Sequence, residues 1–444
     1  MSLHILIAGA GMAGLSAARE LEDRGMRATI IEARDRVGGR VVTLREGFTG
    51  RQHAEGGADL IESDQENACQ LAKRLRLSLV PILKRGFGYY GPDRAGRVRR
   101  QSAFDGFAPI NEALASLVRD YKLAAQRWDG PIAGRLSQRS VSDWVRSICT
   151  DRSRGEIEQL ISRFRGFRGL FLADPEELSL LALVDFFADD PFGGDSVMQR
   201  VVGGNDQLAT ALAATLDSPI HLRTVLRRVR AGRSGVTVTV DTPTGRTDVR
   251  ADALICTLPP VPLRRIIFEP GLPRPQQQAI RELHMGPATR LTLQFASRFW
   301  RRRRQPSLFA SDQPTGAVWD GNEEQHGKTA ILSLLAGGSA SAELQRLLAR
   351  GGPQAVVRRL GWLGRPSKLI SARAITWEND PWAGGGYAAF HTGFDPGLRE
   401  WLARPFGRVL FAGEHTSLDA QGYMEGAVES GQRAAAEISA MAAS

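Results

Sequence analysis

The chain has 444 residues, of which 42% are hydrophobic and 24% charged, as in ordinary folded globular proteins. That length exceeds what one hydrophobic core usually organises, so we expect two lobes. The formal net charge is +10, but there are only five lysines and the arginines are spread along the chain, which does not favour a nucleic-acid partner.

The first forty residues predict a dinucleotide-binding unit. An apolar run at 4–8 is followed at once by the sequence GAGMAG, by a helical pattern, and by a second apolar run that ends at Glu32. In such a unit the glycines permit a tight turn, the approach of a pyrophosphate and close packing of the helix, whose N-terminus faces the phosphates. The acid at 32 is placed to accept hydrogen bonds from a ribose. The candidate cofactor-binding residues are Gly9, Gly11, Met12, Ala13, Gly14 and Glu32.

The motif continues as EARDRVGGR at 32–40. With this segment the chain resembles the flavin-dependent amine oxidase family, which includes monoamine oxidase, polyamine oxidase and the flavin histone demethylases. The resemblance implies FAD, with this run wrapped around the pyrophosphate and Arg40 reaching its charge. It adds the candidates Ala33, Arg34, Gly39 and Arg40. It also implies an α/β fold of amine-oxidase type, with a discontinuous Rossmann-like FAD-binding domain and a second α+β substrate domain.

The next informative stretch is EGGA at 55–58, where small residues permit close backbone approach. The family carries a similar element where the chain passes the flavin, which suggests Gly56, Gly57 and Ala58, although a structural turn would also explain it. Amino-acid oxidases of the superfamily carry an arginine soon afterwards to hold a carboxylate. Here Asp59 follows instead, and we expect it to repel a carboxylate and attract a cation.

Helical patterns dominate the next part of the chain. They cover 67–77, 110–128, 141–148, 157–167 and 176–187, with strand-like pieces around 87–90 and 98. No glycine motif occurs in the helical stretches after residue 78, so they predict a lobe that covers a site. The sequence RFRGFR at 163–168 indicates an arginine-bearing helix face.

The chain then returns to the cofactor lobe at VVGGN, 201–205. Strands are expected at 225–229 and 236–240, and 253–260 is expected to be the last parallel strand. By resemblance, Val225 contacts the adenine through its backbone. The core of a β-meander would explain these valines equally well.

We therefore divide the chain into alternating pieces. The FAD-binding domain takes 1–77, 200–284 and 384–444. The substrate domain takes the helical piece 78–199 and the sheet piece 285–383, with a long strand at 288–295. The basic run at 301–304 is interpreted as a solvated loop.

The final segment contains FAGEH at 411–415 and GYMEGA at 422–427. In the family, the acid binds the ribityl chain, and a helix that begins at the second motif points its N-terminus at the flavin pyrimidine ring. A helix N-terminus there stabilises the negative charge of the reduced ring. By resemblance the residues are Gly413, Glu414, Tyr423 and Met424, although a helix that only docks would explain part of this pattern.

The catalytic candidates are Arg290, Trp377, Tyr387 and Tyr423. Monoamine oxidases resemble the segment PWAGGGY at 381–387 but have a flavin-bonded cysteine where Gly386 stands, so the FAD should be non-covalent. The two tyrosines correspond to the pair that flanks the substrate nitrogen in monoamine oxidases. Arg290 stands where the family usually has a lysine that is hydrogen-bonded through water to flavin N5. That departure puts the use of oxygen in doubt, and Arg290 could equally be an ordinary strand residue.

The function implied by the resemblance is oxidation of a small amine. Hydride passes from the α-carbon to flavin N5, the imine hydrolyses to an aldehyde or ketone, and O2 is reduced to hydrogen peroxide. An L-amino-acid oxidase or a carbon–carbon desaturase of the same superfamily is the alternative. A flavin-containing nucleic-acid or chromatin-binding protein is the non-enzymatic one.

Several features are missing from the chain. Its three cysteines lie far apart and form neither a disulfide framework nor a metal spacing. No apolar run reaches the roughly 20 residues of a membrane span, and no secretory signal precedes the first strand. We therefore expect a cytoplasmic protein without a metal or a membrane partner. The oligomeric state cannot be read from the sequence.

Overall fold

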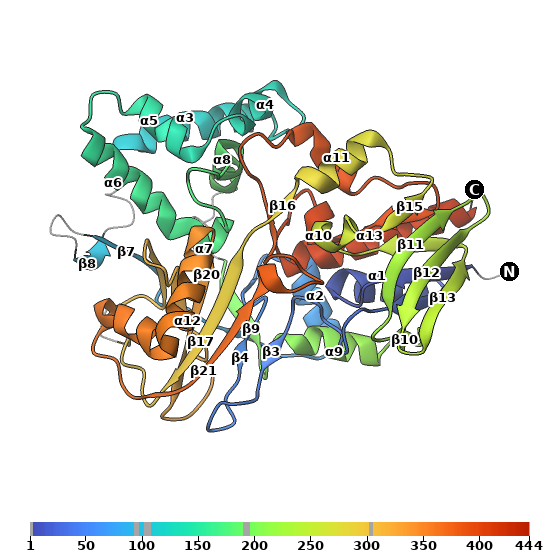
Figure 1. Ribbon diagram of the computed structural model, residues 1–444, viewed down its shortest axis with the longest axis horizontal. Helices are drawn as coiled ribbons and strands as arrows, with labels where there is room; N and C mark the ends of the chain where they lie inside the picture. Colours follow the sequence, from blue (N-terminus) through green and yellow to red (C-terminus); the bar gives the residue numbers. More distant parts are fainter. Residues whose placement is uncertain (1–2, 93–96, 102–107, 190–195, 302–304, 444) are drawn as a thin grey trace.

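The computed structural model describes residues 3–92, 97–101, 108–189, 196–301 and 305–443 (Figure 1). Most of the basic run at 301–304 therefore lies outside the described residues. Two bodies of structure lie side by side in Figure 1, one built on a parallel sheet near the chain termini and one on a larger sheet with a helical layer above it.

The parallel sheet has five strands, and its central strand β1 is the first apolar run of the chain. The order is β10 (Ile220–His221), β2 (Arg27–Ile31), β1 (His4–Ala8), β14 (Ala253–Cys256) and β23 (Val409–Phe411). Each neighbouring pair runs parallel. The expectation that 253–260 is the last parallel strand is wrong, because β23 follows it. At three residues, β23 is too short to give a periodic signal.

Helices cover one face of this sheet and a second sheet covers the other. On the first face, α1 (Met12–Asp23), α9 (Asp206–Ala214) and α13 (Met424–Ala443) share one apolar core with the strands. On the second face lies a four-stranded sheet of β13 (Gly245–Ala251), β12 (Val236–Thr242), β11 (Val225–Ala231) and β15 (Ile267–Glu269). The valines at 236, 238 and 240 are buried in that core, as their alternation requires.

Three short helical elements border this second core. They are α10 (Pro260–Leu263), α11 (Arg274–Glu282) and the 3₁₀ segment η5 (Pro396–Leu402). Leu263, Ala279 and Leu398 contribute their side chains to it.

The second body is organised on a seven-stranded sheet. Its order is β21 (Leu369–Thr376), β17 (Ala288–Phe295), β20 (Ala330–Gly337), β19 (Ala317–Asp320), β18 (Leu308–Ser311), β7 (Phe87–Pro92) and β8 (Val98–Gln101). All eight residues of β17 are buried, and the helix α12 (Ser339–Arg359) packs on this sheet. The strand expected at 288–295 therefore has the expected bounds.

Small two- and three-stranded sheets join the two bodies. They pair β3 (Thr43–Leu44) with β4 (Ala54–Glu55), β16 (His284–Met285) with β22 (Ala388–Ala389), and β9 (Met198–Val201) with both β5 (Ile61–Glu62) and β6 (Leu79–Pro81). Strands far apart in sequence are thus held together where the cavity described below lies.

The helical layer has a hydrophobic core of its own. Its helices are α3 (Ala108–Leu123), α4 (Pro131–Ser137), α5 (Val141–Ile148), α6 (Arg154–Phe164), α7 (Arg168–Phe171) and α8 (Leu180–Ala188). The helix α6 begins at a capping box formed by Ser153 and Glu156, which the expected start at 157 missed. The helix α2 (Glu66–Arg74) lies nearer the parallel sheet. Among the described residues, no helix combines the length and the apolar character that crossing a membrane requires.

The strands of the parallel sheet come from residues 1–77, 200–284 and 384–444, and five of the seven strands of the larger sheet come from 285–383. We propose the domain boundaries at 77, 199, 284 and 383 on this basis.

Candidate active site

A continuous cavity of about 2130 Å³ lies among the two large sheets and the helical layer. Its wall contains nearly all of the residues singled out from the sequence. Those that line it are Gly9, Gly11, Met12, Ala13, Glu32, Ala33, Arg34, Gly39, Arg40, Gly57, Ala58, Val225, Arg290, Trp377, Tyr387, Gly413, Glu414, Tyr423 and Met424. Gly14 and Gly56 do not line it and lie behind its surface.

The glycine turn between β1 and α1 leaves room for a phosphate. Gly9 has a φ of +108°, and a Cβ there would lie 2.3 Å from Oγ1 of Thr257. A Cβ on Gly14 would lie 1.9 Å from the Gly9 carbonyl oxygen, so this glycine lets helix and strand pack. A Cβ on Gly11 would meet nothing within 4 Å, although Gly11 lines the cavity. No side chain caps α1 and its first turn holds no acid, so its N–H groups remain available to an anion.

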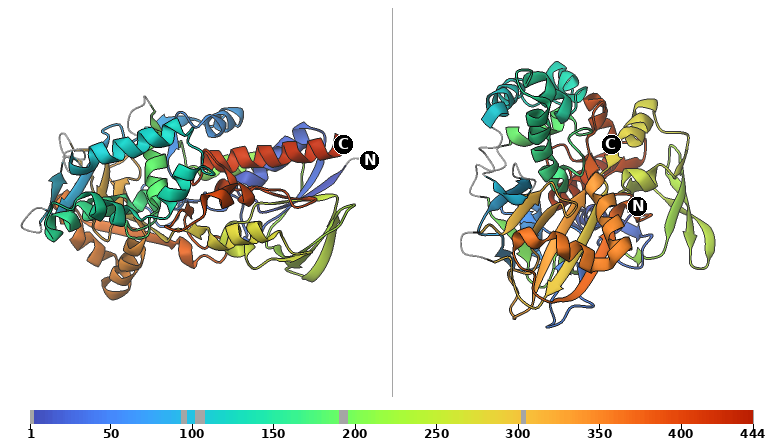
Figure 2. Two further views of the ribbon diagram at one scale, coloured as in Figure 1. Left: turned by 90° about the horizontal axis from the view of Figure 1, so that it is seen from above. Right: turned by 60° about the vertical axis from the view of Figure 1, so that its left-hand side comes forward.

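The two helices α1 and α13 pack side by side and begin at different depths along the cavity. A Cβ on Gly431 would lie 2.2 Å from the Ala13 carbonyl oxygen, so the backbones are in close contact. Both helices run toward the chain termini (Figure 2). Met424 lies seven residues before Gly431, so α13 begins about 10 Å beyond α1. Two positive helix ends are therefore offset along one cavity, as an elongated dinucleotide requires.

The strands β2 and β11 contribute residues to the cavity wall. The Glu32 carboxylate accepts hydrogen bonds from the backbone N–H groups of Ala10 and Arg34, each at 2.8 Å. The backbone N–H of Thr224 donates to the Glu32 carbonyl oxygen at 2.8 Å, which brings Val225 beside Glu32. The Arg34 guanidinium forms a two-pronged ion pair with Asp380 at 2.7 and 2.8 Å, so it is held at the cavity edge.

Arg40 and Glu414 both line the cavity and form an ion pair with each other. Nη1 of Arg40 donates to Oε1 of Glu414 and to the Gly386 carbonyl oxygen, each at 2.8 Å. The second oxygen of Glu414 accepts the backbone N–H of Gly422 at 2.9 Å. The pair joins the EARDRVGGR segment to both later motifs. A Cβ on Gly57 would lie 1.8 Å from the Arg40 carbonyl oxygen, so only glycine permits this approach.

Three aromatic candidates lie along the same wall. The Tyr387 hydroxyl donates to the carbonyl oxygens of Gly169 and Leu170 at 3.1 and 2.8 Å. Burial raises the pKa of Tyr387, and the neighbouring Tyr423 raises it further. A Cβ on Gly422, the residue before Tyr423, would lie 3.4 Å from the Tyr387 ring. Trp377 is only 4% exposed, and its Nε1 donates to the Gly56 carbonyl oxygen at 3.1 Å. The Trp377 side chain therefore packs against Gly56 and Gly57.

Arg290 is buried at 3% exposure and belongs to a charged network. Its Nη2 donates to the Gly57 carbonyl oxygen at 2.8 Å and to Asp59 at 3.2 Å, and its guanidinium lies 4.4 Å from the Trp319 ring centre. Its Nη1 has no hydrogen-bond partner among the described residues. Burial lowers the pKa of Arg290, and the charge of Asp59 opposes that change.

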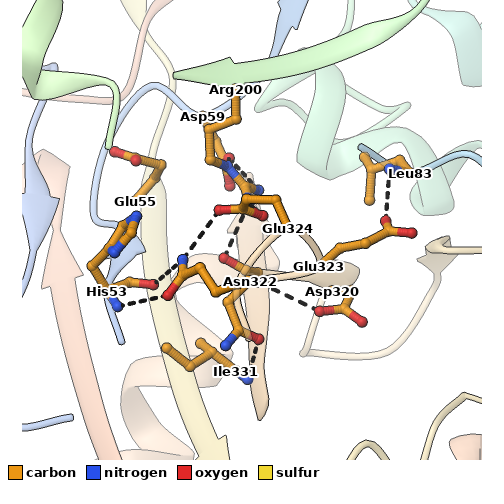
Figure 3. Close-up of polar contacts among 12 residues, drawn as sticks. His53, Glu55, Asp59, Leu83, Arg200, Asp320, Asn322, Glu323, Glu324 and Ile331 are labelled. Carbon is orange, nitrogen blue, oxygen red and sulfur yellow. Dashed lines mark hydrogen bonds and ion pairs between the residues drawn. The ribbon is translucent and has the colours of Figure 1, made fainter. Parts of the chain in front are cut away.

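The expectation that Asp59 attracts a cation into the site is wrong. Arg200, itself fully buried, forms ion pairs of 2.7 Å with both Asp59 and Glu324 (Figure 3). Trp319 donates to Asp59 at 2.8 Å. With Arg290 as well, the carboxylate is compensated by two arginines. The sequence gives no sign of this because Arg200 lies 141 residues away.

One arginine of the RFRGFR segment departs from the expected arginine-bearing face, whereas Arg165 keeps a partly exposed ion pair with Glu176. Arg168 is 3% exposed, and it donates to Asp174 and Ser339 instead of facing solvent. The phenylalanines at 164 and 167 line the cavity, together with others at 171, 186 and 187. These residues were not identified from the sequence. The repeated phenylalanine at 164, 167 and 171, spaced as on one helix face, is the signal that was available.

A family model described as flavin-containing amine oxidoreductase matches residues 12–439. The chain belongs to that family. This match confirms the expected enzyme class, a flavin-dependent amine oxidase, together with the fold class and the need for a flavin.

Individual relatives agree with this assignment. The chain is 28% identical to a Mycobacterium tuberculosis protein that bears the provisional name flavin-containing monoamine oxidase AofH, over 99% of this chain and 97% of that protein. It is 29% identical to an L-amino-acid oxidase of Siganus canaliculatus, over 98% and 85%. The structure of cyclohexylamine oxidase from Brevibacterium oxydans IH-35A matches with a TM-score of 0.86 at 26% identity, over all of both chains.

Proposed function

We propose that this family member binds FAD non-covalently and oxidises a small amine. The observation that carries the proposal is one continuous cavity that is lined both by the glycine turn and by Tyr387, Tyr423 and the start of α13. A monoamine oxidase and an L-amino-acid oxidase are both among the relatives, so the family alone does not select the substrate.

The residues present fit an extended dinucleotide. The α1 N-terminus and the open space at Gly11 would receive the pyrophosphate, with Arg40 nearby to balance its charge. Glu32 would accept the ribose hydroxyls, and Glu414 would face the ribityl chain. Gly386 offers no thiol to the cofactor, which supports non-covalent binding.

Bound FAD would supply the redox chemistry, namely acceptance of a hydride from the carbon next to the amine nitrogen and return of two electrons to oxygen as hydrogen peroxide. The nitrogen lone pair forms the C=N bond as the hydride leaves, so the amine must first lose its ammonium proton. Water then hydrolyses the imine to an aldehyde or ketone.

The chain's own task is to orient and desolvate the amine. Burial raises the pKa of both Tyr387 and Tyr423, so both phenols stay neutral. We expect their electron-rich ring faces to flank the nitrogen. The bonds from the Tyr387 hydroxyl to two backbone carbonyls fix that ring in place. Removal of water from the nitrogen by these rings disfavours the ammonium ion.

Oxidation of an L-amino acid is the second candidate, and one observation favours it. The buried Nη1 of Arg290 has no hydrogen-bond partner among the described residues, and a substrate carboxylate would satisfy it. The nearby Asp59 weighs against this, because its charge already neutralises much of the arginine.

Anaerobic mixing of the FAD-loaded protein with amines and with L-amino acids tests the proposal. We expect amines to bleach the flavin absorbance and oxygen to restore it with release of peroxide. Bleaching by amino acids alone would select the second candidate. A protein that does not take up FAD would contradict both.

A further inference from the structure

Asp59 lies between two buried arginines, and both of its carboxylate oxygens are engaged. Oδ1 accepts a hydrogen bond from Nε of Arg200 at 2.8 Å. Oδ2 accepts one from Nη2 of Arg290 at 3.2 Å and one from the indole of Trp319 at 2.8 Å. All four residues are 5% exposed or less. The orientation of the carboxylate is therefore fixed from both sides.

The buried charges around Asp59 alternate in sign. Arg290 pairs with Asp59, Asp59 pairs with Arg200, and Arg200 pairs with Glu324, the last two pairs being drawn in Figure 3. Two arginines and two carboxylates carry no net charge. Arg290 and Asp59 line the cavity, whereas Arg200 and Glu324 do not. Because buried charges act strongly on their neighbours, the cavity meets a guanidinium whose charge is largely cancelled.

Arg290 belongs to the part of the wall where we place the oxidation. Its Nη2 donates to the Gly57 carbonyl oxygen at 2.8 Å, and a Cβ on Gly57 would lie 3.1 Å from the Trp377 ring. Burial raises the pKa of Tyr387, and the charge of Arg290 opposes that rise. Nη1 of Arg290 has no hydrogen-bond partner among the described residues. One donor on this wall is therefore available to a bound molecule.

Trp319 holds the arginine and the carboxylate together. The guanidinium carbon of Arg290 lies 4.4 Å from the centre of the Trp319 ring, while the indole N–H donates to Asp59. The ring thus contacts the cation with its face and the anion with its edge. An asparagine at position 59 keeps an oxygen that accepts these hydrogen bonds, so Asp59→Asn removes the charge and little else.

We propose that Asp59 is a positioning residue that neutralises Arg290 within the cavity. The guanidinium still donates a hydrogen bond but does not attract anions, so the site selects amines against substrates that carry a carboxylate. The same cancellation keeps the positive charge beside the flavin low. The inference rests on the proposed amine oxidation and identifies a side chain that determines its specificity.

Binding of benzoate and of its neutral analogue benzamide to the FAD-loaded protein tests the inference without turnover. The two molecules have nearly the same shape, so the ratio of their dissociation constants reports the charge of the site. In the parent we expect benzoate to bind no tighter than benzamide. In Asp59→Asn, benzoate should bind at least about tenfold tighter than in the parent, because an unopposed guanidinium holds a carboxylate, and benzamide should change little. Titration calorimetry gives both constants.

The midpoint potential of the bound FAD is the second measurement. Loss of the Asp59 charge leaves Arg290 free to stabilise the negative charge of the reduced cofactor. We expect Asp59→Asn to raise the potential by at least about 30 mV, which is a tenfold change for two electrons. Anaerobic equilibration with reference dyes measures it.

Two further variants show whether Asp59 acts through Arg290. In an Arg290→Met background, Asp59→Asn should leave the benzoate ratio and the potential close to their Arg290→Met values. Asp320→Asn is the matched control, because Asp320 is also buried and paired with two arginines, Arg298 and Arg301, but does not line the cavity. It should keep the parent ratio and potential. Flavin content and the thermal unfolding midpoint establish that each variant is folded.

The outcomes separate this inference from the proposed function. Tenfold tighter binding of benzoate than of benzamide by the parent would overturn the inference, and this result needs no variant that folds. Unchanged binding and potential in Asp59→Asn, or equal shifts in Asp320→Asn, would also overturn it while amine oxidation stands. A protein that holds FAD but oxidises no amine would overturn the proposed function, and the benzoate ratio would still decide whether Asp59 neutralises Arg290. A protein that takes up no FAD would overturn both.

Discussion

Arg290 is held by a set of contacts that a lysine could not reproduce together. One nitrogen bonds both the Gly57 carbonyl and Asp59, and the flat guanidinium lies over Trp319. We predict that Arg290→Met slows anaerobic bleaching by amine at least tenfold, because a nearby positive charge stabilises the reduced flavin. Arg290→Lys should slow bleaching by less than about threefold, because the positive charge is kept. For scale, a tenfold change in rate corresponds to about 1.4 kcal/mol of activation free energy.

Rapid mixing with amine, followed by separate mixing of the reduced protein with oxygen, measures both half-reactions. Arg27→Met, at an exposed position, is the control for removal of one arginine. Equal rates for Arg290→Met and the parent in both half-reactions would show that Arg290 acts only as a strand residue.

Glu55 gives a second prediction at the scale of one residue. It is fully buried, accepts hydrogen bonds from Asn205 and Thr43, and burial raises its pKa from 4.5 to about 8, with the Asp59 charge adding to the shift. The folded chain therefore keeps a proton that the unfolded chain releases. The stabilisation, on the order of a few kcal/mol, is complete below pH 4.5 and is lost as pH rises through 8.

We predict that Glu55→Gln flattens the fall of the thermal unfolding midpoint between pH 5 and 9, because the amide cannot ionise. Scanning calorimetry across that range measures it, with Glu46→Gln at an exposed position as the control. Parallel profiles for parent and Glu55→Gln would mean that Glu55 is ionised in the folded chain.

At the scale of elements, the contact between α1 and α13 holds two helix N-termini toward one cavity. We predict that Gly431→Ala drives the helices apart, because its Cβ would lie 2.2 Å from the Ala13 carbonyl oxygen. The expected cost is about 1–3 kcal/mol in stability, with weaker FAD retention. Gly361→Ala is the matched control, since a Cβ there would meet nothing within 4 Å. FAD content after gel filtration and the unfolding midpoint are the measurements, and a Gly431→Ala variant equal to the control would contradict the role of this contact.

Sequence patterns predicted the elements whose signal is local. The strand at 288–295 and the helix at 141–148 have the expected bounds, because each carries a strong period over eight residues. The three-residue strand β23 carries no such period and was missed. The pairing of Asp59 with Arg200 depends on tertiary packing across more than one hundred residues. The position of the phenylalanines at 167, 171 and 186 along the cavity depends on how separate helices pack. No local pattern contains that information.

At the scale of the whole molecule, the chain has a positive net charge, but the charged groups near Tyr423 are negative. The net charge is +10, yet Glu62, Asp64 and Asp189 line the cavity. Burial is the largest cause of the raised pKa of Tyr423, and the charges of these three carboxylates raise it further. Asp64 and Asp189 are also exposed to solvent, so they form part of the cavity rim. Negative charge at the rim should attract ammonium ions from solution before they lose their proton.

We predict that the double variant Asp64→Asn with Asp189→Asn lowers kcat/KM for a monoamine severalfold at low ionic strength and leaves kcat nearly unchanged. The difference from the parent should shrink as salt is added, because the screening length falls from about 30 Å at 0.01 M to about 3 Å at 1 M. Steady-state peroxide production across that range is the measurement. Asp217→Asn, at an exposed position that does not line the cavity, is the control. A salt dependence that is the same in the parent and the double variant would show that these carboxylates do not steer the substrate.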